Sequence, residues 1–133
     1  MSKEIVIDAS AIIAVIANEP ERAALVGLTE GADLLAPLSI PWEIGNAFSA
    51  MLKRRRISVE QAVQAIEIYH TIPIRFVEVE LEEAIQLADR LNIYAYDAYL
   101  LRCAARYRAP LLSLDRDLLT TATALGLPVL EVL

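Results

Sequence analysis

The apolar and polar positions along the chain predict an alternation of short strands and helices. Continuous apolar runs, rather than alternating ones, are typical of strands buried on both faces of a parallel sheet. Such runs predict strands at 5–7, 34–36, 74–77, 110–113 and 128–132. Between them, apolar residues recur at helical spacing, which predicts helices over about 9–17, 20–30, 40–55, 58–70, 80–92, 96–108 and 115–126.

This order of elements predicts an α/β fold. Strands separated by helices form a mostly parallel sheet, here five-stranded, with about seven helices in layers on both faces. In such sheets, ligands bind beyond the carboxyl ends of the strands. We therefore look for a site where the predicted strands end.

Individual residues refine the helices. Ser39 and Pro41 are start signals for the third helix, and Ser58 with Gln61 has the spacing of a capping box. The third helix has the apolar stripe Ile44, Phe48, Met51 and Leu52. In the fifth helix we expect the inward residues to be Leu81, Ala84, Ile85, Ala88 and Leu91. The sixth helix has the stripe Tyr96, Tyr99, Leu100, Cys103 and Tyr107.

Length and composition fit one domain spanning residues 1–133. A chain of 133 residues with 56% hydrophobic and 23% charged residues can build a core without disulfides. No apolar run approaches the roughly 20 residues of a membrane span, and the apolar run at the N-terminus is too short for a signal peptide. The lone Cys103 suits a small core residue. Together these features favour the cytoplasm.

The net charge of −6 has the wrong sign for a protein that binds nucleic acid through its overall field. A nucleic-acid function would need bound cations or a local basic patch. The densest basic run is Lys53–Arg56, which is also explained as a solvated helix end.

Four acidic residues stand where a site is expected. Asp8 closes the first strand, and Asp115 follows the fourth by two residues. Glu43 lies in the first turn of the third helix, opposite its apolar stripe, and Asp97 opens a helix that is apolar nearly all round. Each acid also has an ordinary explanation, because carboxylates are favoured at helix N-termini.

The motifs VIDASA, WEIGNAF, YDAYLL and LLSLDRDL together resemble the PIN-domain ribonucleases, in particular the VapC-type toxins of toxin–antitoxin pairs. The resemblance covers essentially the whole chain. It implies a PIN-like three-layer α/β/α fold and a four-acid site for Mg²⁺ or Mn²⁺, made by Asp8, Glu43, Asp97 and Asp115. It also assigns supporting positions to Ser10, Asn46, Ser113 and Asp117. Ser113 departs from the threonine that such proteins often carry, but keeps the hydroxyl.

The chemistry of these residues agrees with that implication. Crowded carboxylates repel one another, and a hard divalent cation with oxygen ligands relieves the repulsion. We expect Asp8, Glu43 and Asp97 to be the principal ligands. Asp115 is expected to bind a second metal or hold a water. One cysteine and one histidine, His70, give no zinc-site spacing.

The resemblance further implies RNA as substrate, a homodimer and a cognate antitoxin. Three alternatives remain open: a PIN-domain RNA-processing nuclease without a toxin role, a catalytically silent PIN-like binding module, and a phosphotransfer domain with Asp8 as nucleophile. Against the last, position 10 holds serine where a second acid is usual, and the only lysines, Lys3 and Lys53, follow no later strand.

Overall fold

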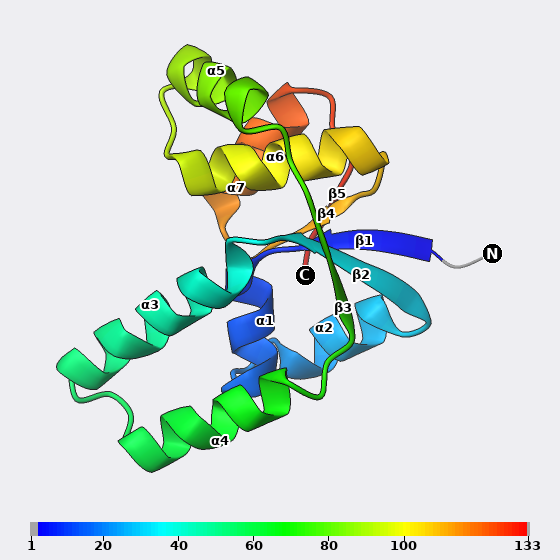
Figure 1. Cartoon of the computed structure of the whole chain (residues 1–133). Coiled ribbons are helices and arrows are strands. Elements are labelled where there is room, and N and C mark those ends of the chain that lie inside the picture. Colours follow the sequence, from blue (N-terminus) through cyan, green and yellow to red (C-terminus); the bar gives the residue numbers. More distant parts are fainter. Residues whose placement is uncertain (1–2, 133) are drawn as a thin grey trace.

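The computed structural model describes residues 3–132, and within them it has the predicted alternation of strands and helices (Figure 1). The strands are β1 (Lys3–Ile7), β2 (Ala32–Pro37), β3 (Ile74–Val77), β4 (Leu111–Leu112) and β5 (Val129–Leu130). The helices are α1 (Ala9–Ile16), α2 (Arg22–Thr29), α3 (Ile40–Lys53), α4 (Val59–Tyr69), α5 (Leu81–Leu91), α6 (Ala95–Tyr107) and α7 (Arg116–Ala124). The α/β prediction is confirmed.

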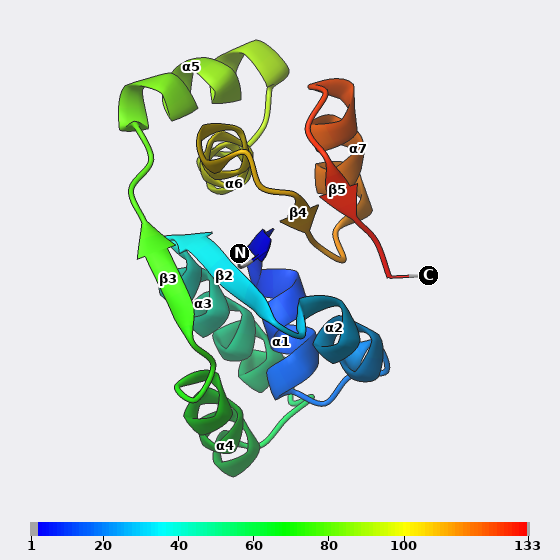
Figure 2. The same ribbon diagram turned by 90° about the vertical axis from the view of Figure 1, so that its right-hand side faces the viewer.

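All strand pairings in the sheet are parallel, and the strand order is β3-β2-β1-β4-β5. Helices α1 to α4 cover one face and α5 to α7 the other, which gives three layers (Figures 1 and 2). The chain builds outward from β1 to β2 and β3, and then crosses back to add β4 on the other side of β1. The strand order therefore reverses between β1 and β4, and a crevice for ligands is expected at their carboxyl ends.

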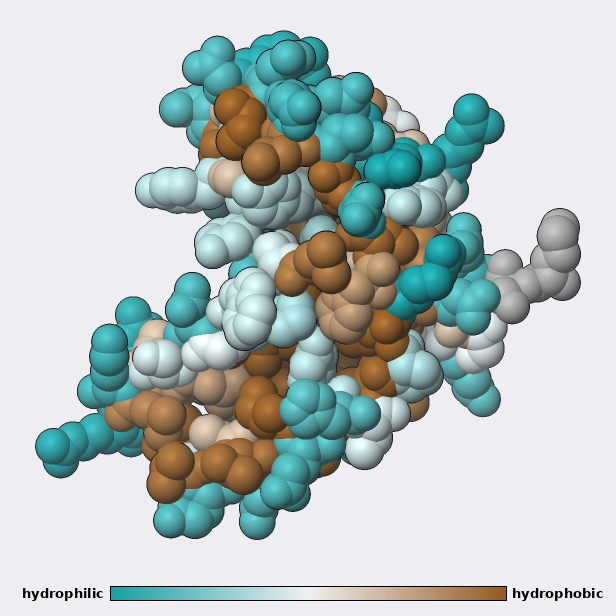
Figure 3. Space-filling view, viewed as in Figure 1, coloured by the Kyte–Doolittle hydropathy of each residue, from teal (hydrophilic) through white to brown (hydrophobic). Residues whose placement is uncertain are grey.

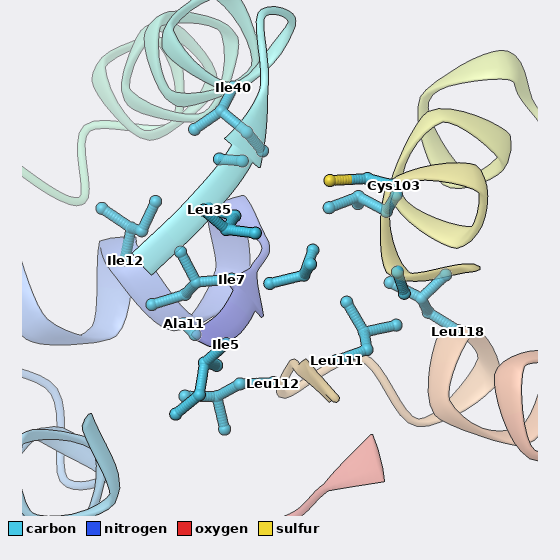
Figure 4. Packing of buried hydrophobic residues seen from close by; sticks show 14 of the residues in the cluster. Ile5, Ile7, Ala11, Ile12, Leu35, Ile40, Cys103, Leu111, Leu112 and Leu118 are labelled. Atoms are coloured by element: carbon cyan, nitrogen blue, oxygen red, sulfur yellow. The ribbon is translucent and has the colours of Figure 1, made fainter. Parts of the chain in front are cut away.

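The core forms where the central strands meet helices from both layers. Ile5, Val6 and Ile7 of β1 are buried, as the continuous apolar run predicted. Figure 4 shows Ile12 of α1 on one side of this strand and Cys103 of α6 with Leu118 of α7 on the other. Cys103 is fully buried, so its interpretation as a core residue is confirmed.

The predicted inward faces of two helices are partly wrong. Leu81 and Ile85 of α5 are 56% and 51% exposed, and the helix instead buries Ala84 and Leu87. Tyr96 of α6 is 45% exposed, although it lies in the predicted apolar stripe. In Figure 2, α5 is the outermost element above the sheet and packs beside α6. A helix that packs against one main neighbour buries only part of the apolar face that its sequence contains.

The capping predictions agree with the structure. Ser58 and Gln61 form both hydrogen bonds of a capping box at the start of α4. His70 is the exposed C-cap residue of the same helix. Among residues 3–132, the helices are all too short or too polar to cross a lipid bilayer.

Candidate functional site

Asp8 occupies the reversal point of the sheet. It follows β1 directly and is the N-cap of α1, where its side chain accepts a hydrogen bond from the Ala11 amide at 3.0 Å. The Ser10 hydroxyl donates to the same carboxylate at 2.8 Å, and the Ser113 hydroxyl donates to Oδ2 at 2.5 Å. Asp8 is only 4% exposed. A buried carboxylate held by three donors has a fixed orientation, as a first ligand or reacting group requires.

The two serines also join the first turn of α1, which contains Ser10, to the loop after β4, which contains Ser113. Ser10 Oγ accepts a hydrogen bond from the Leu114 amide at 3.0 Å, and Ser113 Oγ accepts one from the Asp115 amide at 2.9 Å. The family resemblance implied supporting positions for both serines, and both donate hydrogen bonds to Asp8 in the structure.

Glu43 reaches the site from α3. It lies in the first turn of that helix, and its Oε2 accepts a hydrogen bond from the Ser39 hydroxyl at 3.1 Å. Ser39 was predicted only as a helix start signal; it is the N-cap residue, but its side chain makes no capping hydrogen bond and turns to Glu43 instead. The sequence offered one signal for this contact, the i, i+4 spacing of the two residues.

The pKa values of the acids show that they share one electrostatic environment. Burial raises the pKa of Asp8, and the charge of Asp115 adds to the rise. Burial raises the pKa of Glu43 to about 7, with further contributions from the charges of Asp8 and Asp97. The pKa of Asp97, in the first turn of α6, is raised by burial and by the charge of Asp115. Four acids from different parts of the chain therefore repel one another at this edge of the sheet.

Asp115, Asp117 and Asn46 lie at the exposed rim. Asp115 is the N-cap of α7, and its carboxylate accepts hydrogen bonds from the Asp117 and Leu118 amides at 3.0 and 3.2 Å. Asp117 is exposed in the first turn of α7, and Asn46 is exposed one turn after Glu43 on α3. Asp115 thus serves as a helix cap and as a member of the acid cluster at once.

The donor set of the acid cluster suits a hard divalent cation, because carboxylates that raise one another's pKa are stabilised by a positive charge between them, and the neighbouring hydroxyl oxygens are hard donors as well. The carboxylates are not gathered around a single point. Among residues 3–132, no group of three or more Asp, Glu, His or Cys side chains is placed so that it could hold a metal ion. Coordination of one ion by several of these acids therefore requires their side chains to come closer together.

A comparison with family models decides the family. The model described as the PIN domain matches residues 5–124. The chain belongs to the PIN-domain family. A comparison with curated proteins finds no match.

Solved structures share the PIN fold of this chain. PAE2754 from Pyrobaculum aerophilum has a TM-score of 0.70 at 22% identity, covering 98% of this chain and 92% of that one. VapC20 from Mycobacterium tuberculosis, described as a sarcin-ricin loop cleaving toxin, has a TM-score of 0.63 at 17% identity, covering 92% and 95%. VapBC2 from Rickettsia felis, bound to a promoter DNA fragment, has a TM-score of 0.68 at 11% identity, covering 96% and 98%. At these identities the likeness shows the fold.

Proposed function

We propose that this PIN-domain protein is a metal-dependent endoribonuclease that hydrolyses RNA phosphodiester bonds, and that it is the toxin of a type II toxin–antitoxin pair. The observation that carries the proposal is the cluster of four mutually repelling acids at the reversal point of a PIN-domain sheet. Three buried or partly buried carboxylates with raised pKa are costly for the fold, and such groups gather at functional sites.

Asp8, Glu43 and Asp97 are the proposed ligands of Mg²⁺ or Mn²⁺, and Asp115 is the proposed holder of a second ion or a water. When bound, a divalent cation acidifies water for attack on phosphorus and stabilises charge on the phosphate oxygens. Ser10 and Ser113 hold the Asp8 carboxylate in place. Ser39 orients Glu43, and Asn46 and Asp117 are exposed residues one turn after Glu43 and two residues after Asp115.

Family membership argues against the phosphotransfer alternative, and the burial of Asp8 argues the same way. A nucleophilic aspartate must present a free oxygen to the phosphorus atom, whereas both oxygens of Asp8 accept hydrogen bonds from serine hydroxyls. A ligand position tolerates this arrangement better, because hydrogen bonds to a ligating carboxylate fix its orientation.

A cleavage assay tests the proposal against the silent-module alternative. We expect the purified chain to cut single-stranded RNA in Mg²⁺ or Mn²⁺ and to lose all cutting in excess EDTA, with recovery when the cation is restored. Double-stranded RNA and DNA of the same sequence are run beside it. Absence of cutting under every metal condition would contradict a nuclease and favour a binding module.

The toxin role implies a cognate antitoxin and action in the cytoplasm, where RNA is the target. VapC20 is described as a toxin, and VapBC2 is a second structure of the same fold. Co-expression of the adjacent small gene product with this chain tests the pairing directly. A toxin is expected to arrest growth when induced alone and to be neutralised by that neighbour. Growth unaffected by induction of an active nuclease would favour an RNA-processing role.

The proposed homodimer has a candidate surface on α5. Leu81 and Leu38 line one pocket of about 240 Å³ and are 56% and 59% exposed, and Ile85 follows Leu81 by one turn. Exposed apolar side chains gathered in one place indicate association. We expect Ile85→Glu to convert a dimer to a monomer in multi-angle light scattering, while Val63→Glu on α4 does not. A monomeric wild-type chain at high concentration would contradict the homodimer.

A further inference from the structure

Exposed aromatic side chains are concentrated beside the acid cluster. Within the described residues, the exposed Trp, Tyr and Phe side chains are Trp42, Tyr94, Tyr96 and Phe76. Trp42 directly precedes Glu43 in the first turn of α3, and Tyr96 directly precedes Asp97 in the first turn of α6. Tyr94 is the N-cap residue of α6. Three of the four exposed aromatics thus adjoin two of the site acids.

The degree of exposure is unusual for residues of this size. Trp42 is 73% exposed, Tyr94 84% and Tyr96 45%. Large aromatic side chains are normally used to fill cores and interfaces, so several exposed together mark a binding surface. Tyr96 also contacts Tyr99 edge-to-face, with ring centroids 6.1 Å apart. That contact limits the motion of the Tyr96 ring.

The two helices that carry these aromatics face the same opening. The charge of Asp97 raises the pKa of Glu43, so the first turns of α3 and α6 lie within electrostatic range of each other. Ser39, the N-cap of α3, and Tyr99, three residues after Tyr96 on α6, both line the pocket that also includes Leu38 and Leu81, so the starts of the two helices are neighbours. The three exposed aromatics lie outside that pocket. Figure 3 shows a hollow on the left of the view, between the part formed by α5 and α6 and the part formed by α3, bordered by side chains of intermediate hydropathy.

Electrostatic attraction is a weak source of RNA affinity for this chain. The net charge is −6, and three arginines are paired with glutamates: Arg75 with Glu4, Arg102 with Glu83 and Arg106 with Glu80. The basic run from Lys53 to Arg56 begins in the last turn of α3, ten residues after Glu43. That spacing places it about 15 Å away along the helix axis. Arg116, exposed at the start of α7 directly after Asp115, is the one arginine next to a site acid in sequence, so most of the affinity close to the acids must come from other contacts.

We propose that Trp42, Tyr96 and Tyr94 form a stacking platform for unpaired RNA bases on either side of the phosphate to be cut. This inference rests on the proposed nuclease function and deepens it, because it assigns three named aromatic residues to the binding of the bases that flank the cut. Every base has a face that stacks on an aromatic ring, whereas paired bases in a duplex are not available. The platform supplies the affinity that an acidic surface lacks.

The tryptophan gives a direct readout, because Trp42 is the only one in the chain. We expect single-stranded oligoribonucleotides to quench its fluorescence in EDTA, where no cutting occurs, and a duplex of the same sequence to leave it unchanged. The apparent affinity should fall only shallowly with added salt, since few phosphates are neutralised. Equal quenching by duplex and single strand, or no quenching at any concentration, would overturn the proposal.

Variants assign the effect to the platform. By anisotropy of labelled single-stranded RNA, Trp42→Ala and Tyr96→Ala are each expected to weaken binding about 10-fold or more, and Trp42→Phe to retain most of it. The control is Val63→Ala, which trims an exposed side chain of α4, 52% exposed. Unchanged RNA binding by Trp42→Ala, together with an altered oligomeric state, would overturn the proposal in favour of a protein interface.

The outcomes separate this inference from the function on which it rests. A wild-type chain that cuts RNA while Trp42→Ala binds and cuts equally well refutes the platform and leaves the nuclease standing. A chain that cuts nothing with any metal refutes the nuclease, whatever the fluorescence shows.

Discussion

Replacing Asp8 with asparagine is expected to reduce RNA cleavage by about 100- to 1000-fold and to leave the fold intact. Asparagine has the shape of aspartate but carries no charge, and its amide nitrogen cannot accept the hydrogen bonds that the carboxylate receives from Ser10 and Ser113. The site then contains one negative charge fewer. The repulsion among its carboxylates falls, and its attraction for a cation becomes weaker. The measurement is the initial rate of cutting at saturating Mn²⁺, beside circular dichroism and thermal unfolding.

Asp33→Asn is the matched control. Asp33 is exposed near the amino end of β2, at the edge of the sheet opposite to the site, and the substitution changes the same number of atoms and the same charge. It should leave both rate and stability at wild-type values. Wild-type turnover by Asp8→Asn, in a chain that still needs a divalent cation, would remove Asp8 from the active site.

The fold could be predicted from the sequence because the signals are local and strong. The run Ile5–Ile7 is continuously apolar, and the strand it predicted is buried on both sides. When helices connect successive strands, the right-handedness of these connections allows only a few strand orders in a parallel sheet. The acids that follow β1 and β4 must then lie at the edge formed by the carboxyl ends of the strands. The charge of Asp115 does raise the pKa of Asp8, as proximity requires.

Contacts that depend on tertiary packing could not be predicted in this way. In α5, the apolar residues Leu81 and Ile85 compete with Leu87 for the inner face, and the sequence alone does not say which side α6 will cover. Salt bridges from Arg102 and Arg106 of α6 to the acidic start of α5 accompany the observed choice. The hydrogen bond from Ser39 to Glu43 could not be predicted from the sequence either, because a serine at the start of a helix is equally suited to capping the helix.

The second large effect concerns Glu43, whose replacement by glutamine is expected to stabilise the metal-free chain at pH 8 while abolishing cleavage. In the folded chain the pKa of Glu43 is raised from 4.5 to about 7, mainly by burial. Between these values the folded chain keeps a proton that the unfolded chain has released, so the free energy of unfolding falls as the pH rises. For Glu43 the loss develops between about pH 4.5 and pH 7 and is complete above pH 7. Glutamine stays neutral throughout and avoids this loss.

Urea unfolding in EDTA at pH 5 and pH 8 measures the effect. The wild-type chain should be less stable at pH 8 than at pH 5, and Glu43→Gln should remove a large part of that difference; the raised pKa values of Asp8 and Asp97 act in the same direction and account for the remainder. Glu82→Gln, at an exposed position in the first turn of α5, should change nothing. Mn²⁺ should reverse the trend in the wild type, because a cation stabilises the ionised acids and competes with protons for them. Glu43→Gln could instead destabilise the metal-free chain at pH 8. In that case burial and the neighbouring acids do not disfavour the ionised form of Glu43, and its location at this edge of the sheet no longer implies a cation site.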